Sequence, residues 1–112
     1  MIKTILQAAS IPARAVQWSS PPEETYALYF DDVEVDGSDG LEVVILRHAA
    51  MVELYAPTLD DALAAETTFE SQLLARGLRW TKQATYWLKD VQRYQTIYEF
   101  DFIEKKEGQI NG

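Results

Sequence analysis

The chain contains no cysteine and a single histidine, His48, among its 112 residues. Without cysteine, disulfide bonds and thiolate metal sites are impossible, and nothing calls for an oxidising compartment. A serine triad would have to be built around His48, which lies in an apolar strand pattern, and no serine is framed by glycines. The sequence therefore favours a packed or edge histidine over a catalytic base, and we expect no enzyme activity.

Long apolar runs and basic stretches are missing too. No segment approaches the roughly 20 apolar residues that span a bilayer, and the start of the chain lacks the pattern of a secretory signal. Ten Lys and Arg stand against eighteen Asp and Glu, a formal charge of −8. A free-standing nucleic-acid binder needs a basic stripe to neutralise phosphates. We therefore expect a cytoplasmic protein with no membrane contact and no specific nucleic-acid binding.

Glycine is also too sparse for a phosphate-binding loop. Gly37 and Gly40 match neither standard glycine-rich spacing, and no helix follows them. A nucleotide site is therefore not expected, and we predict no cofactor.

The residues that are present suffice for one folded domain over residues 1–112. Hydrophobic residues make up 47% and aromatic residues 12% of the chain, which excludes a disordered protein. A short helix is predicted over residues 1–10, ended by Pro12. Its apolar residues recur at helical spacing and are Ile2, Ile5, Leu6 and Ala9.

A long β-hairpin is predicted over residues 25–55. The turn is assigned to Asp36-Gly37-Ser38-Asp39-Gly40, because these residue types tolerate unusual φ angles. Period-two alternation places apolar residues on one face of each predicted strand. These residues are Tyr26, Leu28 and Phe30 in the first strand, and Val44, Leu46, Ala50, Val52 and Leu54 in the second.

A longer helix is predicted over residues 59–76. Thr58 is a suitable N-cap, two aspartates follow in the first turn, and Gly77 is a typical C-terminal stop. The predicted apolar stripe comprises Leu59, Ala62, Leu63, Phe69 and Leu73. Glu66 interrupts this stripe, so we expect it at the edge of the face or paired with a strand residue.

The last third of the chain is predicted to be a three-stranded meander over residues 78–103, followed by a flexible tail over residues 104–112. Strands on either side of one long helix are typical of an α+β fold. We therefore predict a mainly antiparallel sheet with the long helix packed on one face and a short N-terminal helix.

The acidic hairpin is the strongest metal candidate by pattern. It imitates the first half of a calcium loop through Asp32, Glu34, Asp36 and Gly37. The match fails at the closing glutamate, because Val43 stands in that position and Glu42 comes one place early. Glu99 and Asp101 share a strand face, which is more typical of solvation than of a paired acid and base. We predict no metal site and no catalytic residues.

Aromatic residues are more numerous than one small core face needs. Tyr86 and Trp87 are adjacent, so on a strand they point to opposite sides, and we expect one of them at an interface or on the outer face of the sheet. The alternative is a partly exposed aromatic residue without a role. The long hairpin also places its tip beyond the domain body. The predicted interface residues are therefore Asp36, Gly37, Ser38, Asp39, Gly40, Tyr86 and Trp87.

The order of these elements resembles the small tail-completion, or tail-terminator-like, proteins of long-tailed phages and prophages of Gram-positive bacteria. The resemblance covers nearly the whole chain and rests on pattern and length. It is carried by the short N-terminal helix and by the segments Thr25–Phe30, Val52–Tyr55, Thr58–Asp61, Gly77, Trp80, Tyr86–Leu88 and Tyr94–Phe100. The acidic segment from Asp31 to Glu42 departs most from the family pattern.

This resemblance implies a non-catalytic subunit that forms a homo-oligomeric ring, such as a hexamer. The ring would cap the tail tube and join it to the head connector, so its partners would be itself, the tail-tube protein and the connector protein. Its location would be the host cytoplasm during assembly and then the tail or neck of the virion. Two alternatives stay open, a head-closure or minor head protein and a small-ligand-binding α+β module.

Overall fold

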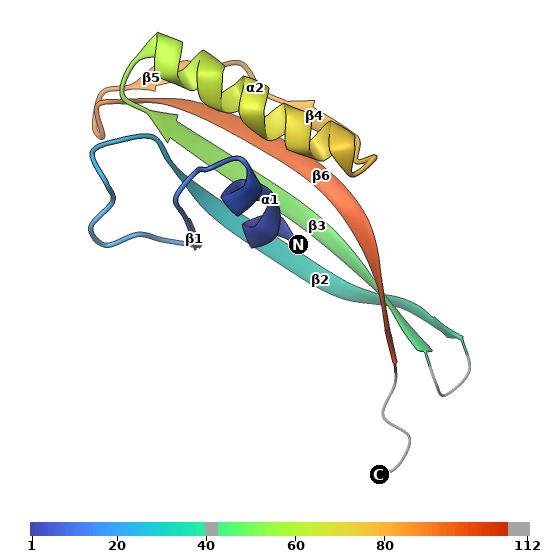
Figure 1. The fold of residues 1–112 in the computed structure, drawn as a ribbon. Coiled ribbons are helices and arrows are strands. Elements are labelled where there is room, and N and C mark those ends of the chain that lie inside the picture. Colours follow the sequence, from blue (N-terminus) through green and yellow to red (C-terminus); the bar gives the residue numbers. More distant parts are fainter. Residues whose placement is uncertain (40–42, 108–112) are drawn as a thin grey trace.

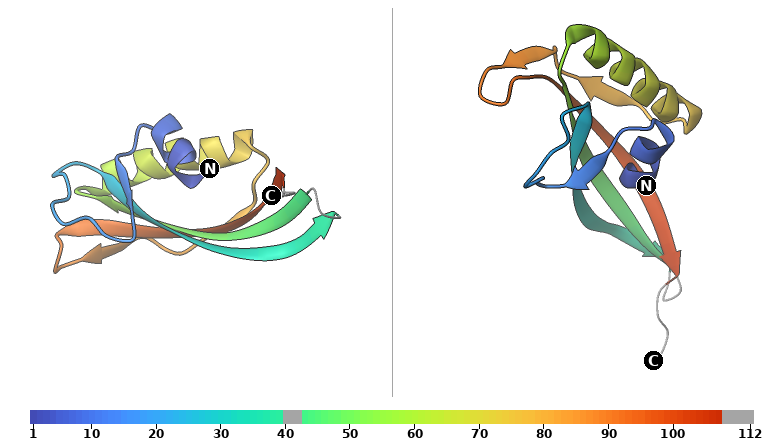
Figure 2. Two further views of the ribbon diagram at one scale, coloured as in Figure 1. Left: turned by 90° about the horizontal axis from the view of Figure 1, so that it is seen from below. Right: turned by 60° about the vertical axis from the view of Figure 1, so that its left-hand side comes forward.

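In the part of the chain that the structure describes, two helices lie on one face of a six-stranded sheet, as the views in Figure 1 and Figure 2 show. The computed structural model describes residues 1–39 and 43–107. In chain order the elements are α1 (Ile2–Ala8), β1 (Ala13–Ala15), β2 (Tyr26–Asp39), β3 (Val43–Ala56), α2 (Leu59–Ala75), β4 (Trp80–Lys82), β5 (Tyr86–Leu88) and β6 (Arg93–Glu107). The strand order is β1-β2-β3-β6-β4, with β5 also paired to β6. Because β1–β2 is parallel and the other described pairs are antiparallel, the predicted α+β fold is confirmed.

Local sequence signals account for the ends of the longer helix, α2. Thr58 Oγ1 accepts a hydrogen bond from the Asp61 backbone N–H at 3.1 Å, which caps the first turn. Gly77 follows the helix with a φ of 69°, a left-handed conformation that glycine adopts without strain. The predicted helix over residues 59–76 is therefore confirmed, with its last helical residue at Ala75.

The core lies between the helices and one face of the sheet. The even-numbered residues of β3 and β6 supply most of the sheet side, including Val52, Leu54, Tyr98 and Phe100, all less than 5% exposed. From the helices come α1 residues Ile2, Ile5 and Leu6 and α2 residues Ala62, Ala65, Phe69 and Leu73. This alternation along the strands is the period-two pattern seen in the sequence.

The predicted apolar stripe of α2 is wrong at two positions. Leu59 and Leu63 are 48% and 52% exposed, whereas Phe69 is fully buried. Successive helix residues are turned by about 100°, so Leu63 lies on the flank of a face centred on Ala62 and Phe69. Glu66, whose carboxylate was expected at the edge of the face, lies among the buried residues of α2.

Glu66 sets the rotation of α2 because each of its oxygens has a partner on another element. Its Oε1 accepts from Lys82 Nζ at 3.0 Å, and its Oε2 accepts from the hydroxyls of Thr96 at 3.0 Å and Thr85 at 2.9 Å. The neighbouring carboxylate of Glu70 accepts from Lys82 as well. A buried charge is tolerated only when it is paired and hydrogen-bonded, so this cluster ties α2 to β4 and β6. The expected strand partner of Glu66 is thereby confirmed.

Two predicted strand boundaries and one predicted strand pairing need correction. The predicted turn residues Asp36 to Asp39 belong to β2, while Gly40 lies outside the described residues. Residues 104–107 of the predicted tail belong to β6, and the rest of that tail lies outside the described residues. The predicted meander is wrong because β4 and β5 both pair with β6, one after the other. The cause is the length of β6, which has room for two three-residue strands on one side.

Phe69 is buried and Leu63 is exposed on α2, so the two residues should contribute differently to the stability of the fold. Phe69→Ala should lower the free energy of unfolding by about 3–5 kcal/mol, because it leaves a cavity in the core. Leu63→Ala, its matched control on the same helix, should lower it by less than about 1 kcal/mol. Urea unfolding curves of the two variants measure both values. Equal losses at the two positions would contradict the helix rotation described above.

Candidate assembly surface

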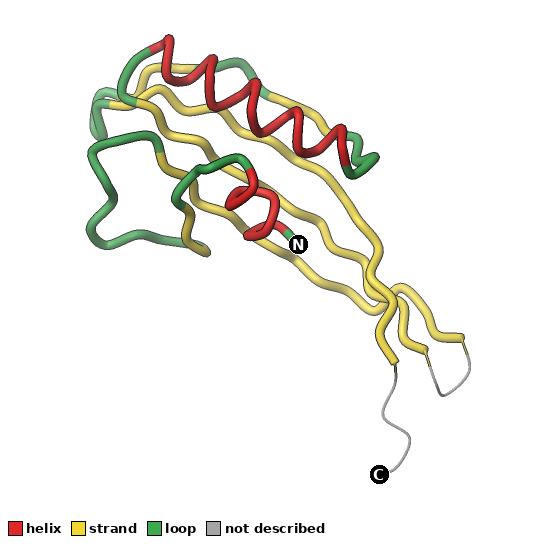
Figure 3. Tube along the Cα trace, in the orientation of Figure 1, coloured by secondary structure: helices red, strands yellow, loops and turns green. Residues whose placement is uncertain are grey.

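A three-stranded arm extends beyond the helices at one end of the sheet (Figure 3). It consists of residues 31–39 of β2, 43–49 of β3 and 101–107 of β6. The arm makes the molecule elongated, with extents of 51 × 29 × 21 Å and a radius of gyration of 16.2 Å. A compact domain of this length would have a radius of gyration of about 13 Å. Val35 and Ile103 are 71% and 53% exposed on the arm, which therefore presents apolar surface to solvent.

One edge of the arm belongs to β2. The backbone N–H of Val16 donates to Tyr29 O at 3.0 Å, and Ala27 N–H donates to Pro12 O. Odd-numbered residues of β2 therefore direct their backbone groups away from β3, because these groups alternate along a strand. Beyond Tyr29, no strand in the described ranges 1–39 and 43–107 pairs with this side. We call residues 31–35 the β2 edge segment.

The opposite edge of the arm belongs to β6. Gln83 N–H donates to Ile97 O at 3.0 Å, so odd-numbered residues of β6 direct their backbone groups away from β3. Pairing with β4 stops at Phe100. Among the strands described, none covers this side of β6 after that point. We call residues 101–105 the β6 edge segment.

The two edge segments run in the same direction and pair with the same part of β3. Both strands are antiparallel to β3, so β2 and β6 are parallel to each other. Val33 is paired with His48, and His48 is paired with Phe102 on its other side. The segments therefore bound the arm symmetrically across one intervening strand.

A histidine clamped between two carboxylates ties the three strands of the arm together. His48 Nδ1 lies 2.9 Å from both carboxylate oxygens of Asp31 on β2, and Nε2 lies 2.8 Å from Glu104 Oε1 on β6. The ring stacks on Phe102, with centroids 4.3 Å apart. Both nitrogens can donate only when the ring is protonated. We call Asp31, His48 and Glu104 the His48 clasp.

The pKa of His48 lies above its ordinary value. Burial of the ring, which is 8% exposed, acts to lower the pKa, but the hydrogen bonds and charges of Asp31 and Glu104 outweigh it. The charged imidazolium is thus the form that the folded arm favours. The sequence pattern predicted a packed or edge histidine, and the structure confirms the packing.

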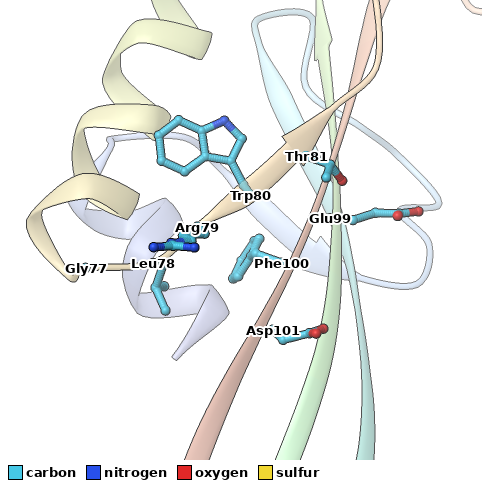
Figure 4. Close-up of a pocket in the computed structure, with 8 residues that line it drawn as sticks. All are labelled: Gly77, Leu78, Arg79, Trp80, Thr81, Glu99, Phe100 and Asp101. Atoms are coloured by element: carbon cyan, nitrogen blue, oxygen red, sulfur yellow. The ribbon is translucent and has the colours of Figure 1, made fainter.

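A groove lies where β4 ends and the β6 edge segment begins (Figure 4). Its volume is about 560 Å³, and its lining residues are Gly77, Leu78, Arg79, Trp80, Thr81, Glu99, Phe100 and Asp101. Trp80 and Phe100 extend toward the helix side, whereas Glu99 and Asp101 extend to the other side (Figure 4). Asp101 also forms an exposed 3.4 Å ion pair with Arg47 of β3.

The predicted interface residues do not form one surface. Asp36 to Asp39 lie at the tip of β2, near the pairing of Val43 with Glu107. Tyr86 and Trp87 lie on β5, at the opposite end of β6, where they are 62% and 46% exposed. Trp87 packs edge-on against Tyr94. The protein therefore has an acidic end and an aromatic end, separated by the length of the sheet.

Sequence reasoning missed the edge segments and the His48 clasp. The period-two alternation of β6 stops after Ile103, where four charged residues follow, so no local pattern marks the rest of this strand. The clasp joins residues 17 and 56 positions apart in the chain, so no local pattern could reveal it. Among the described residues no group of three or more potential ligands could hold a metal ion.

No protein-family model matches the chain, and no curated protein matches it in sequence. Neither helix in the described part of the chain is long and apolar enough to cross a membrane.

The His48 clasp predicts a pH dependence of stability. Because the pKa of His48 is higher in the folded state, the clasp stabilises the fold fully below the unfolded pKa of about 6.5. That contribution should disappear as pH rises through the folded pKa.

The measurement is the free energy of unfolding of the wild type minus that of His48→Gln, followed across this pH range. His48 is the one histidine of the chain, and the subtraction removes the titration of the α-amino group. The difference should shrink as pH rises. A difference that stays constant or grows would contradict the clasp.

Proposed function

We propose that this chain is a non-catalytic assembly subunit that completes the tail of a long-tailed phage or prophage as a homo-oligomeric ring. The ring caps the tail tube and joins it to the head connector. It forms in the cytoplasm of the bacterial host and stays in the tail or neck of the virion. The observation that carries this proposal is the three-stranded arm with its two edge segments.

Uncovered strand edges favour assembly as the role of the arm. A strand edge exposes backbone donors and acceptors that pair readily with another strand, and proteins that stay monomeric usually protect such edges. Here the edge segments include Val33 at 45% and Ile103 at 53% exposure, without a described strand beside them. An edge of this kind supports pairing with a protein partner more directly than it supports binding of a small ligand.

The differing ends of the molecule support a place between two other assemblies. The acidic hairpin end includes Asp36, whereas the other end exposes Tyr86, Trp87 and Val91. Tyrosine and tryptophan are enriched in protein interfaces. A ring subunit with unlike ends can contact the tube on one side and the connector on the other.

The overall charge is consistent with a passage for DNA. A net charge of −8 repels phosphate, so a ring of these subunits would let DNA slide without holding it. An acidic exterior would give the same composition, so this point has less weight than the arm. A head-closure protein is the second candidate, because it would need the same ring geometry and the same two unlike ends.

The test is to add the protein to a polymerising tail-tube protein from the same genome and to score tube length by electron microscopy. We expect shorter tubes, each with density at one end. Deletion of residues 36–40 should impair capping while urea unfolding shows a folded monomer.

Binding to purified connector without any effect on tubes would favour head closure instead. An intact protein that binds neither tubes nor connector would contradict the proposed function.

A further inference from the structure

We propose that the His48 clasp is a proton-dependent tie with two states, which differ on the β6 side of the arm. When the ring is protonated, it holds both outer strands of the arm. When the ring is neutral, it keeps its hydrogen bond to Asp31 of β2 and releases Glu104 of β6, because the departing proton leaves Nε2 for solvent. The tie lies within one copy of the chain, so it goes beyond the proposed function and does not depend on it.

The contacts of the ring need two donors. Nδ1 lies 2.9 Å from each carboxylate oxygen of Asp31, and Nε2 lies 2.8 Å from Oε1 of Glu104. An ionised carboxylate only accepts hydrogen bonds, and a neutral imidazole has a single N–H to donate. The loss of one proton therefore directs a nitrogen lone pair at a carboxylate at hydrogen-bonding distance. One of the two carboxylates must then move away from the ring.

The charges that act on the ring come from the two strands beside it. In the described part of the chain they belong to Asp31 of β2 and Glu104 of β6. Arg47 of β3 lies on the opposite face of the sheet, where it forms an ion pair with β6. On the helix side, Lys3 of α1 and Lys106 of β6 are exposed, and the carboxylates of α2 that face β4 are paired there. The protonation of His48 therefore depends on the two carboxylates that it contacts.

Glu104 is the carboxylate that leaves the ring at the lower cost. It contacts the ring through one oxygen, whereas Asp31 contacts it through both. The Glu104 side chain is 40% exposed, against 32% for Asp31, and it reaches solvent by rotation about more bonds. Asp31 follows Tyr29, the last β2 residue that β1 pairs with, more closely than Glu104 follows Phe100, the last β6 residue that β4 pairs with. The neutral ring should therefore keep Asp31.

Release of Glu104 weakens the attachment of the end of β6. Odd-numbered residues of β6 direct their backbone groups outward, so Glu104 and Lys106 direct theirs to Leu46 and Val44 of β3. Once the side-chain tie is lost, this ladder holds the end of β6 without help from the clasp. The amides of Glu104 and Lys106 should then open to solvent more often.

The tautomer of His48 tests which carboxylate is kept. The chain has one histidine, so nitrogen-15 NMR of the labelled protein shows a single imidazole across a pH titration. The ring should lose its proton above the ordinary pKa of about 6.5. Above that transition we expect the proton on Nδ1 and a bare Nε2. A neutral wild-type ring with its proton on Nε2 would mean that Glu104 is kept, which overturns the proposal.

Two truncations with opposite expectations are matched controls for the tautomer. Asp31→Ala removes the acceptor at Nδ1, so its neutral ring should carry the proton on Nε2 and donate to Glu104. Glu104→Ala should keep the proton on Nδ1, as the wild type does. Asp31→Asn retains an acceptor and should also keep Nδ1–H, which provides a second variant if Asp31→Ala does not fold. The same tautomer in Asp31→Ala and Glu104→Ala would show that Asp31 does not select it and would reject the tie.

Hydrogen exchange measures the loosening of β6. The exchange rates of the Glu104 and Lys106 amides are divided by those of His48→Gln at each pH, which cancels the pH dependence of the exchange chemistry. This ratio should rise by about threefold or more as the ring loses its proton, the effect of losing one partly exposed, charge-assisted hydrogen bond. The amides of Asp32 and Glu34, which face β3 from β2, are the internal control and should change less. An equal or larger rise on β2 would contradict the release of β6.

Glu104→Gln tests the mechanism by rescue. A glutamine amide can accept from the protonated ring through its oxygen and donate to the neutral Nε2 through its nitrogen. The end of β6 should therefore stay attached in both states, and its exchange ratio should stay constant with pH. A rise as large as that of the wild type would show that the loosening does not pass through Glu104 and would overturn the proposal. All these measurements use the free protein, so their failure would leave tail completion standing, and a failure of tube capping would leave the tie standing.

Discussion

Backbone pairing of β3 on both of its sides is the constraint on which the rest of the structure depends. From Val43 to Ala56, β3 is paired with β6, and nearly the same length is paired with β2. The helices are too short to cover a sheet of this length, because α2 has 17 residues at about 1.5 Å each. One half of the sheet therefore becomes a packed body, and the other half becomes the arm.

The arm is held by interactions that differ from those of the body. In the body, apolar side chains pack between two layers, and a paired carboxylate, Glu66, orients the helix. In the arm, where Phe102 still belongs to the core, the strand ladders and the His48 clasp hold the three strands together. Exposed valines and unpaired strand edges are unfavourable in an isolated monomer. Assembly with further copies would cover both features, which is why the arm carries the functional proposal.

Features set by neighbours in the chain could be predicted from the sequence. Thr58 and Gly77 mark the ends of α2 through capping and a left-handed turn. Period-two alternation assigned the core face of β3, and the mixture of one long helix with strands defined the α+β class. These signals are local, because a cap or a strand face depends on residues only a few positions apart.

Only the tertiary structure decided where strands end, which helix side is buried and what surrounds the candidate surface. Asp36 to Asp39 have turn chemistry, yet pairing with β3 keeps them in β2. Leu63 is apolar but exposed, because the partners of Glu66 set the rotation of α2. The His48 clasp and the two edge segments depend on which strands are neighbours. Strand order is determined by long-range packing. The spacing of residues along the sequence therefore does not predict which strands are neighbours.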